Sequence, residues 1–124
     1  GKAEIIEEGK KVAVIGLGKA YQDAKELCKL LDNPYLINPR FMKPLDTEVL
    51  DKLDCETVIT LEDNSLIGGF GSSVKNYLAN TDVTVFNFGI PDNFVTHGNT
   101  DTLRELIKLT PKQIFEEIKP YLTK

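Results

Sequence analysis

Lys11-Val-Ala-Val-Ile-Gly-Leu-Gly18 is the stretch that decides the fold, because its apolar run is continuous and is ended by glycine. A short run of this kind, rich in β-branched residues, predicts a strand that is buried on both faces of a sheet. Apolar residues then recur at helical spacing and predict a helix that ends near Asp32-Asn33-Pro34. The apolar stripe of that helix consists of Ala20, Ala24, Leu27, Cys28 and Leu31. A buried strand followed at once by an amphipathic helix is the unit from which α/β folds are built.

The same alternation continues along the rest of the chain. Further strands are predicted over residues 35–38, 57–61 and 83–88, and helices over residues 47–53, 72–79 and 102–109. Thr110-Pro-Lys-Gln113 is a capping box with proline at the first helical position, so it begins a separate final helix. Alternating strands and helices predict a parallel sheet covered on both faces, which is a three-layer α/β/α fold.

Three segments carry finer predictions. Residues 4–8 form a weak strand whose acidic side chains suit an exposed sheet edge. Asp46 is predicted to cap the helix over residues 47–53. The inward-facing residues of the helices over 47–53 and 72–79 are predicted to be Val49, Leu50, Leu53, Val74, Tyr77 and Leu78.

Composition and charge exclude several classes of protein. A chain of 124 residues with 41% hydrophobic residues has the size of one globular domain, and no repeat or linker divides residues 1–124. The net charge of −4, with no basic run longer than Lys10-Lys11, argues against a nucleic-acid partner. The apolar runs are far shorter than the ~20 residues of a membrane-spanning helix, and we expect no membrane partner. Cys28 and Cys55 lack metal-binding spacing and are expected to be reduced thiols, which predicts a cytoplasmic protein.

Gly16-Leu-Gly18 is a first candidate for ligand binding, because glycines after a strand let the backbone approach a phosphate at the next helix N-terminus. The motif is incomplete. Tyr21 stands where a third glycine is required, and the second strand ends in Asn38 rather than in an acidic residue that could hold a ribose. A tight turn between strand and helix explains the same glycines and is the favoured interpretation.

Glu62-Asp63-Asn64 follows a predicted strand, at the edge where open α/β sheets usually place ligands. Two acids and an amide could hold a cation or act as acid and base. Adjacent residues at a strand end point in opposite directions, however, so a role in capping the turn or in meeting another domain is favoured. Gly68, Gly69 and Gly71 would let the next helix begin close to another backbone.

Two further candidates lie in predicted loops. Arg40 and Lys43 flank an apolar pair, and a fixed guanidinium there could grip a carboxylate or a phosphate. His97 is the single histidine, and no serine or cysteine of the chain lies in a nucleophile elbow that could pair with it. We therefore predict no catalytic, cofactor-binding or metal-binding residue.

Three stretches, in this order and spacing, resemble the C-terminal domain of the 1-deoxy-D-xylulose-5-phosphate synthase family, whose enzymes are of transketolase type. They are Asn38-Pro-Arg-Phe-Met-Lys-Pro-Leu-Asp46, Thr60-Leu-Glu-Asp-Asn-Ser-Leu-Ile-Gly-Gly-Phe-Gly-Ser72 and Gly89-Ile-Pro-Asp-Asn-Phe-Val-Thr-His-Gly98. The resemblance extends from about Gly9 to Ile118. It implies a mixed five-stranded sheet of order 1-3-2-4-5 whose first strand is antiparallel, which fits the weak strand over residues 4–8.

The resemblance also implies a function. Intact enzymes of this family join pyruvate to glyceraldehyde 3-phosphate on thiamine diphosphate with magnesium, in the isoprenoid precursor pathway, and the cofactor site lies in the two preceding domains. The chain lacks the motifs of that site, so we expect a fragment of a larger enzyme that binds neither cofactor and is inactive alone. Its expected partners are the preceding domains of the same enzyme, within a homodimer of the parent. The candidate interdomain residues are Arg40, Lys43, Glu62, Asp63, Asn64, Gly68, Gly69, Gly71 and His97.

Two alternatives stay open. The same fold could be a regulatory module with a ligand at the switch point between Gly18 and Glu62. The parent could also be another transketolase-type enzyme, such as an acetoin or pyruvate dehydrogenase β subunit.

Overall fold

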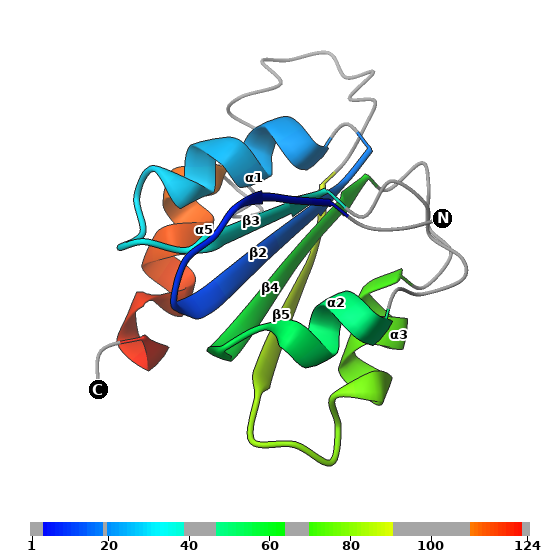
Figure 1. The fold of residues 1–124 in the computed structure, drawn as a ribbon. Helices are drawn as coiled ribbons and strands as arrows, with labels where there is room; N and C mark the ends of the chain where they lie inside the picture. Colours follow the sequence, from blue (N-terminus) through cyan, green and yellow to red (C-terminus); the bar gives the residue numbers. More distant parts are fainter. Residues whose placement is uncertain (1–3, 19, 39–46, 64–69, 91–109, 123–124) are drawn as a thin grey trace.

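The computed structural model describes residues 4–18, 20–38, 47–63, 70–90 and 110–122 (Figure 1). The strands are β1 (Glu4–Glu7), β2 (Lys11–Leu17), β3 (Tyr35–Asn38), β4 (Cys55–Asp63) and β5 (Thr84–Ile90). The helices are α1 (Ala20–Cys28), α2 (Thr47–Lys52), α3 (Phe70–Tyr77) and α5 (Pro111–Ile118), followed by the 3-10 turn η2 (Lys119–Tyr121). The helix predicted over residues 102–109 and the cap at Asp46 lie outside the described residues.

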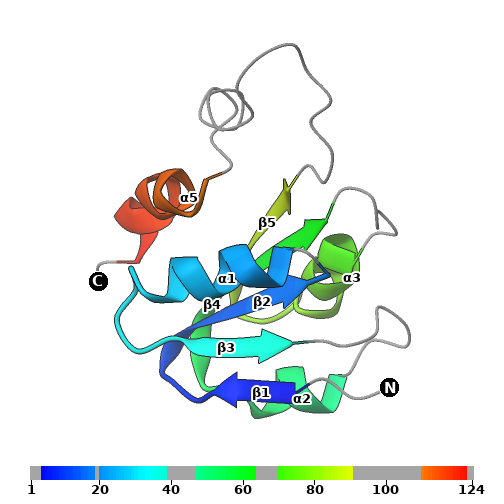
Figure 2. The same cartoon turned by 90° about the horizontal axis from the view of Figure 1, so that it is seen from above.

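The five strands form one sheet of order β1-β3-β2-β4-β5, as Figure 2 shows from above. β1 is antiparallel to β3, and every other neighbouring pair is parallel. This confirms the predicted mixed sheet and its strand order. The weak, acid-flanked segment is the edge strand β1, while the apolar stretch that ends in glycine is β2, the centre of the sheet.

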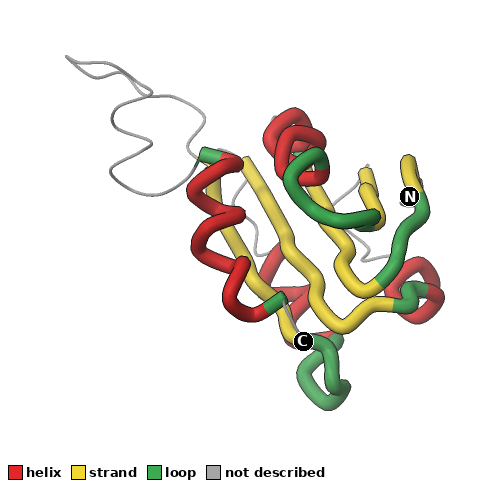
Figure 3. Tube along the Cα trace, turned by 90° about the vertical axis from the view of Figure 1, so that its left-hand side faces the viewer, coloured by secondary structure: helices red, strands yellow, loops and turns green. Residues whose placement is uncertain are grey.

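Helices cover both faces of the sheet, and the strands lie between them as a middle layer (Figures 1 and 3). α1 and α5 pack on one face through an apolar cluster, here called the α1/α5 layer. α2 and α3 pack on the other face through a second cluster, the α2/α3 layer. Successive residues of β2 alternate between the two clusters, since Ala13 and Ile15 join the α2/α3 layer and Val14 joins the α1/α5 layer. The three-layer α/β/α prediction is confirmed.

Two helices, α1 and α3, differ from their predictions by two residues or more at one end. α1 ends at Cys28 instead of near Asp32, because the following amides bond three residues back, Leu30 N–H to Leu27 O at 2.9 Å and Leu31 N–H to Cys28 O at 3.2 Å. These tighter turns keep the apolar spacing but leave the α-helical ladder. α3 begins at Phe70, two residues before the predicted start.

Tyr77 corrects the predicted stripe of α3. Val74 and Leu78 are buried as expected, but Tyr77 is 41% exposed. Its hydroxyl donates a hydrogen bond to Asp51 Oδ1 of α2 at 2.7 Å. A phenol can join an apolar stripe or turn its polar end outward, and the nearby carboxylate favours the second arrangement.

The predicted N-cap of α5 is confirmed. Thr110 is the N-cap, its Oγ1 accepts from the Gln113 backbone N–H at 3.2 Å, and Pro111 is the first helical residue. The helix buries Ile114 and Ile118 against the sheet. Within the described part of the chain, no helix is long and apolar enough to cross a bilayer.

Candidate functional site

Two of the predicted interdomain residues, Glu62 and Gly71, are described completely. Asp63 is described as the last residue of β4, without its side chain. The remaining candidates lie outside the described residues: Arg40, Lys43, Asn64, Gly68, Gly69 and His97. The site can therefore be built from the carboxyl end of β4 and the start of α3.

Glu62 joins the sheet to α3. It lies near the end of β4, paired with Leu17 of β2 and Gly89 of β5. Its Oε2 accepts a hydrogen bond from the Gly71 backbone N–H at 2.9 Å. Gly71 is the second residue of α3, where amides have no partner within the helix and the helix dipole favours a negative charge. The carboxylate thus caps a helix from a distant strand.

A second polar pair, which the sequence analysis missed, lies beside this contact. Thr60 is fully buried in β4, and its Oγ1 donates a hydrogen bond to Asn87 Oδ1 of β5 at 2.6 Å. The strand register places these two residues directly opposite each other. The available signal was the period of two, because Thr60 shares a face with Glu62, and Asn87 interrupts the apolar strand between Phe86 and Phe88.

Gly71 holds the two pairs together by its lack of a side chain. A Cβ atom at this position would lie 2.8 Å from Asn87 Cγ, 2.9 Å from Asn87 Oδ1 and 3.0 Å from Glu62 Oε2. Those distances are shorter than packed atoms tolerate, so any larger residue at position 71 would displace the Asn87 or Glu62 side chain and disturb its hydrogen bond. Thr60, Glu62, Gly71 and Asn87 are named the Glu62 cluster below.

One atom of the Glu62 cluster is unsatisfied. Glu62 Oε1 is buried and accepts no hydrogen bond from the described residues. An acceptor left in this state costs about 1–3 kcal/mol, and more for a charged group. The cluster therefore retains an acceptor that a further donor would stabilise.

The arrangement suits anchoring better than catalysis. The cluster holds one carboxylate, one amide and one hydroxyl, and it contains no nucleophile with an adjacent base. The residues that the structure describes contain no group of histidine, cysteine and acidic side chains able to hold a metal ion. The hydrogen bonds of the Glu62 cluster instead connect β4, β5 and α3 at the carboxyl edge of the sheet.

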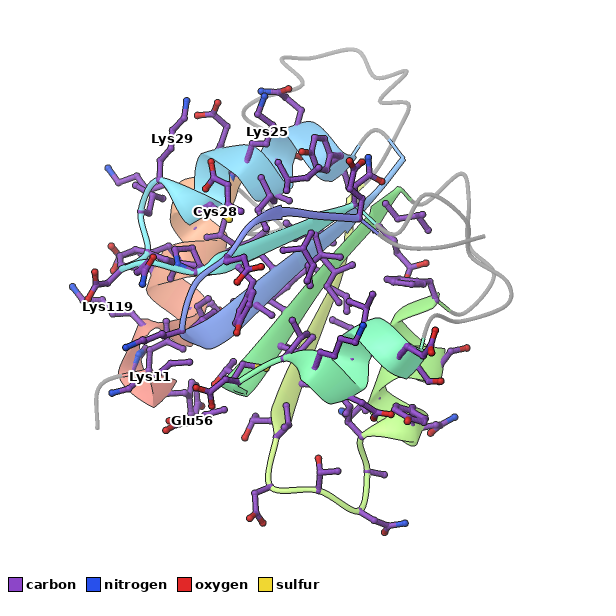
Figure 4. The ribbon with its side chains drawn as sticks, viewed as in Figure 1. Lys11, Lys25, Cys28, Lys29, Glu56 and Lys119 are labelled. Atoms are coloured by element: carbon purple, nitrogen blue, oxygen red, sulfur yellow. The ribbon has the colours of Figure 1, made fainter. Side chains whose placement is uncertain are left out.

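The two cysteines are also poor nucleophiles. Cys28 packs on the inner side of α1 (Figure 4), and burial, followed by the charge of Glu7, raises its pKa to about 12. Burial, followed by the charge of Asp54, raises the pKa of Cys55 to about 11. A thiol reacts as its thiolate, so both remain largely unreactive at neutral pH.

Packing explains the glycines of Gly16-Leu-Gly18. A Cβ atom at Gly16 would lie 2.6 Å from Ala24 Cβ and 2.8 Å from Tyr21 Cα, both in α1. Gly18 adopts a φ of 66°, and its carbonyl accepts from the Tyr21 N–H at 3.1 Å. Gly16 therefore faces a helix at contact distance, where no phosphate could approach it.

Comparison with known proteins gives the same fold. The family model described as "Transketolase, C-terminal domain" matches residues 1–114. A solved structure named "Split gene transketolase, inactive beta4 tetramer" superposes with a TM-score of 0.78 at 25% identity, covering 99% of this chain and 43% of that one.

Two relatives with similar sequences bear the same name. The 1-deoxy-D-xylulose-5-phosphate synthase of Chlorobaculum tepidum is 40% identical over 126 residues, covering 95% of this chain. The enzyme of the same name from Pseudoalteromonas translucida is 40% identical over 126 residues, covering 98% of this chain. In both cases the matched region spans 20% of the relative's length. The fold, the family model and these relatives agree that the chain belongs to the family of transketolase C-terminal domains.

Proposed function

We propose that the chain serves as the C-terminal domain of a 1-deoxy-D-xylulose-5-phosphate synthase, where it docks onto the catalytic domains and contributes to a homodimer. The observation that carries this proposal is the coverage: 40% identity over nearly the whole chain, against 20% of the relative's length. The remaining length of such an enzyme would hold the other domains. A cytoplasmic location follows from the same assignment.

The parent reaction would use thiamine diphosphate, on which transketolase-type enzymes depend, together with magnesium. The described residues do not fit the magnesium ion. They hold no cluster of acidic side chains for a cation, and the Glu62 carboxylate already caps α3. Condensation of pyruvate with glyceraldehyde 3-phosphate is therefore assigned to the preceding domains, and the chain alone is inactive.

The Glu62 cluster supports the docking role. It lies at the carboxyl edge of the sheet, where open α/β folds meet their ligands and neighbours. The Glu62–Gly71 hydrogen bond fixes the start of α3 at that edge. Arg40, Lys43, Asp63, Asn64, Gly68, Gly69 and His97 belong to the same proposed interdomain face.

Mutation of the full-length parent tests this role. Glu62→Ala removes the cap of α3 and the unsatisfied acceptor, so we expect weaker dimerisation and lower turnover. Glu56→Ala is the matched control, because Glu56 is an exposed carboxylate near the opposite end of the same strand (Figure 4). Wild-type mass and turnover in both variants would refute the interface.

Inactivity of the isolated chain is tested separately. The purified 124-residue chain, supplied with thiamine diphosphate, magnesium, pyruvate and glyceraldehyde 3-phosphate, should release no carbon dioxide above the buffer control. Product formation at any protein-dependent rate would contradict the proposal.

A further inference from the structure

The two edges of the sheet are protected to different degrees. β1 has only four residues, two of them the glutamates Glu4 and Glu7, and its pairing with β3 shifts register between Ile5 and Glu7. Short length, charge and an irregularity are the features by which proteins keep an edge strand from pairing with another chain. The β1 edge therefore carries three such features.

β5, at the opposite edge, carries none of them. Its seven residues, Thr-Val-Phe-Asn-Phe-Gly-Ile, include no charged residue and no proline. Its register against β4 runs without a shift from Thr84 to Ile90. Among the described residues, no strand pairs with its outer side. A strand with these properties is a template for a further strand.

We propose that β5 pairs antiparallel with β5 of a second copy of this chain, about a two-fold axis that passes beside Asn87. The sheet then continues across both copies. The proposal deepens the homodimer of the proposed function, on which it rests, by naming the surface that forms it.

The side chains of β5 are self-complementary in this register. Centring the pair on Asn87 sets Phe86 opposite Phe88 at two symmetrical positions. Both rings belong to the α1/α5 layer, so each aromatic pair would lie on one face. Such reciprocal contacts are what a two-fold interface requires.

Asn87 fits the position beside the axis. It is exposed, and its Oδ1 accepts from Thr60, which leaves the amide nitrogen to donate to the same residue of the second copy. Because β5 is uncharged, pairing two copies opposes no like charges. The equivalent pairing of β1 would set Glu4 opposite Glu7, which is unfavourable. Charge therefore favours β5 over β1 as the self-pairing edge.

Cross-linking tests the register. In antiparallel pairs, opposed Cα atoms are about 4.5–5.5 Å apart, within disulfide range. The variant Asn87→Cys should form a disulfide-linked dimer on oxidation, while Asn80→Cys, at an exposed turn residue before β5, should not. Oxidation of the wild-type chain is the control for disulfides formed by Cys28 or Cys55. Failure of Asn87→Cys to cross-link, or equal cross-linking at residue 80, would overturn the proposal.

Charge placed on the strand tests the surface. Asn87→Lys and Thr84→Lys should each raise the dimer dissociation constant by about tenfold or more in sedimentation equilibrium, because like charges oppose association. Asn80→Lys should leave it unchanged. Thermal unfolding checks that each variant folds. Asn87→Lys also removes the hydrogen bond from Thr60, whereas Thr84→Lys leaves that bond in place and so tests the charge alone. Unchanged association of a folded Thr84→Lys variant would overturn the inference.

Amide exchange excludes other occupants of β5. Those amides of residues 84–90 that point away from β4 should become protected only as the chain concentration rises, whereas the amides that bond β4 are protected throughout. Full protection of the outward-facing amides at the lowest concentration would mean that another segment of the same chain pairs with β5. That result would overturn the proposal of a second copy. In the full-length parent, a dimer that Thr84→Lys leaves intact would refute β5 pairing but not the proposed function. A monomeric wild-type parent would refute the dimer itself.

Discussion

The two helix layers hold the same sheet by different means. The α1/α5 layer contacts the sheet through apolar side chains, among which Leu27, Ile114 and Ile118 are fully buried against the strands. The α2/α3 layer adds hydrogen bonds to its apolar contacts, including Glu62 to Gly71. Apolar burial is insensitive to orientation, whereas a hydrogen bond fixes two groups at one distance. Both layers therefore supply apolar stability, and the second also sets the geometry of the carboxyl edge.

Truncation in the α1/α5 layer should have the largest effect on stability. Leu27→Ala removes a fully buried side chain and leaves a cavity, which should lower the free energy of unfolding by about 2–5 kcal/mol. Leu30→Ala, just beyond α1 and 43% exposed, should change it by about 0.5 kcal/mol or less. Denaturant titration of the isolated chain measures both values. Equal losses in the two variants would mean that burial of Leu27 does not stabilise the fold.

Crowding in the α2/α3 layer should lower the free energy of unfolding less than the Leu27 truncation, and it should displace neighbouring side chains. Gly71→Ala forces Asn87 or Glu62 to move, for which we expect a loss of about 1–3 kcal/mol. Amide resonances of residues 84–90 should shift as Asn87 is displaced. Ser72→Ala, at the next and exposed position of α3, is the control. It should change neither the free energy of unfolding nor the amide resonances of residues 84–90. A neutral Gly71→Ala variant would show that the close approach of α3 is not required.

The Glu62 hydrogen bond should contribute less again. Glu62→Ala leaves the Gly71 amide without its acceptor and should cost about 1–2 kcal/mol. Glu62→Gln keeps a carbonyl oxygen in the same place and should cost less than Glu62→Ala. Equal losses would show that packing, rather than the hydrogen bond, holds α3 to β4.

Most of the fold could be predicted because strands and helices have different apolar periods. β2, β3 and the cap of α5 were placed correctly from local pattern alone. Strand order was not available in this way. Alternation predicts a parallel sheet, and only the resemblance to a known family supplied the order in which its strands lie.

The site was harder to predict because its contacts join distant parts of the chain. Glu62 could be placed at a strand end, but its acceptor role depends on where α3 begins. Thr60 and Asn87 are 27 residues apart, and their pairing follows from the register of two parallel strands. Tyr77 was misplaced because helical spacing does not show which way a phenol turns at the edge of a stripe.

The smallest effect that separates the two layers concerns their thiols. Cys28 packs in the α1/α5 layer and Cys55 in the α2/α3 layer. Burial first, and then a nearby acidic residue, raises the pKa of Cys28 from 9.0 to about 12 and that of Cys55 from 9.0 to about 11. The thiol with the lower pKa holds more thiolate at a given pH, so iodoacetamide should label Cys55 faster than Cys28 in the folded chain.

Unfolding should abolish this difference, since both thiols then titrate near their ordinary value. Each folded pKa lies above the unfolded one, so the folded chain binds its thiol protons more tightly. That contribution to stability is complete below pH 9 and is lost as pH rises through about 11 and then about 12. Peptide mass spectrometry of labelled chain, with and without denaturant, measures the two rates. Faster labelling of Cys28 than of Cys55 in the folded chain would show that the apolar layer is the more open one.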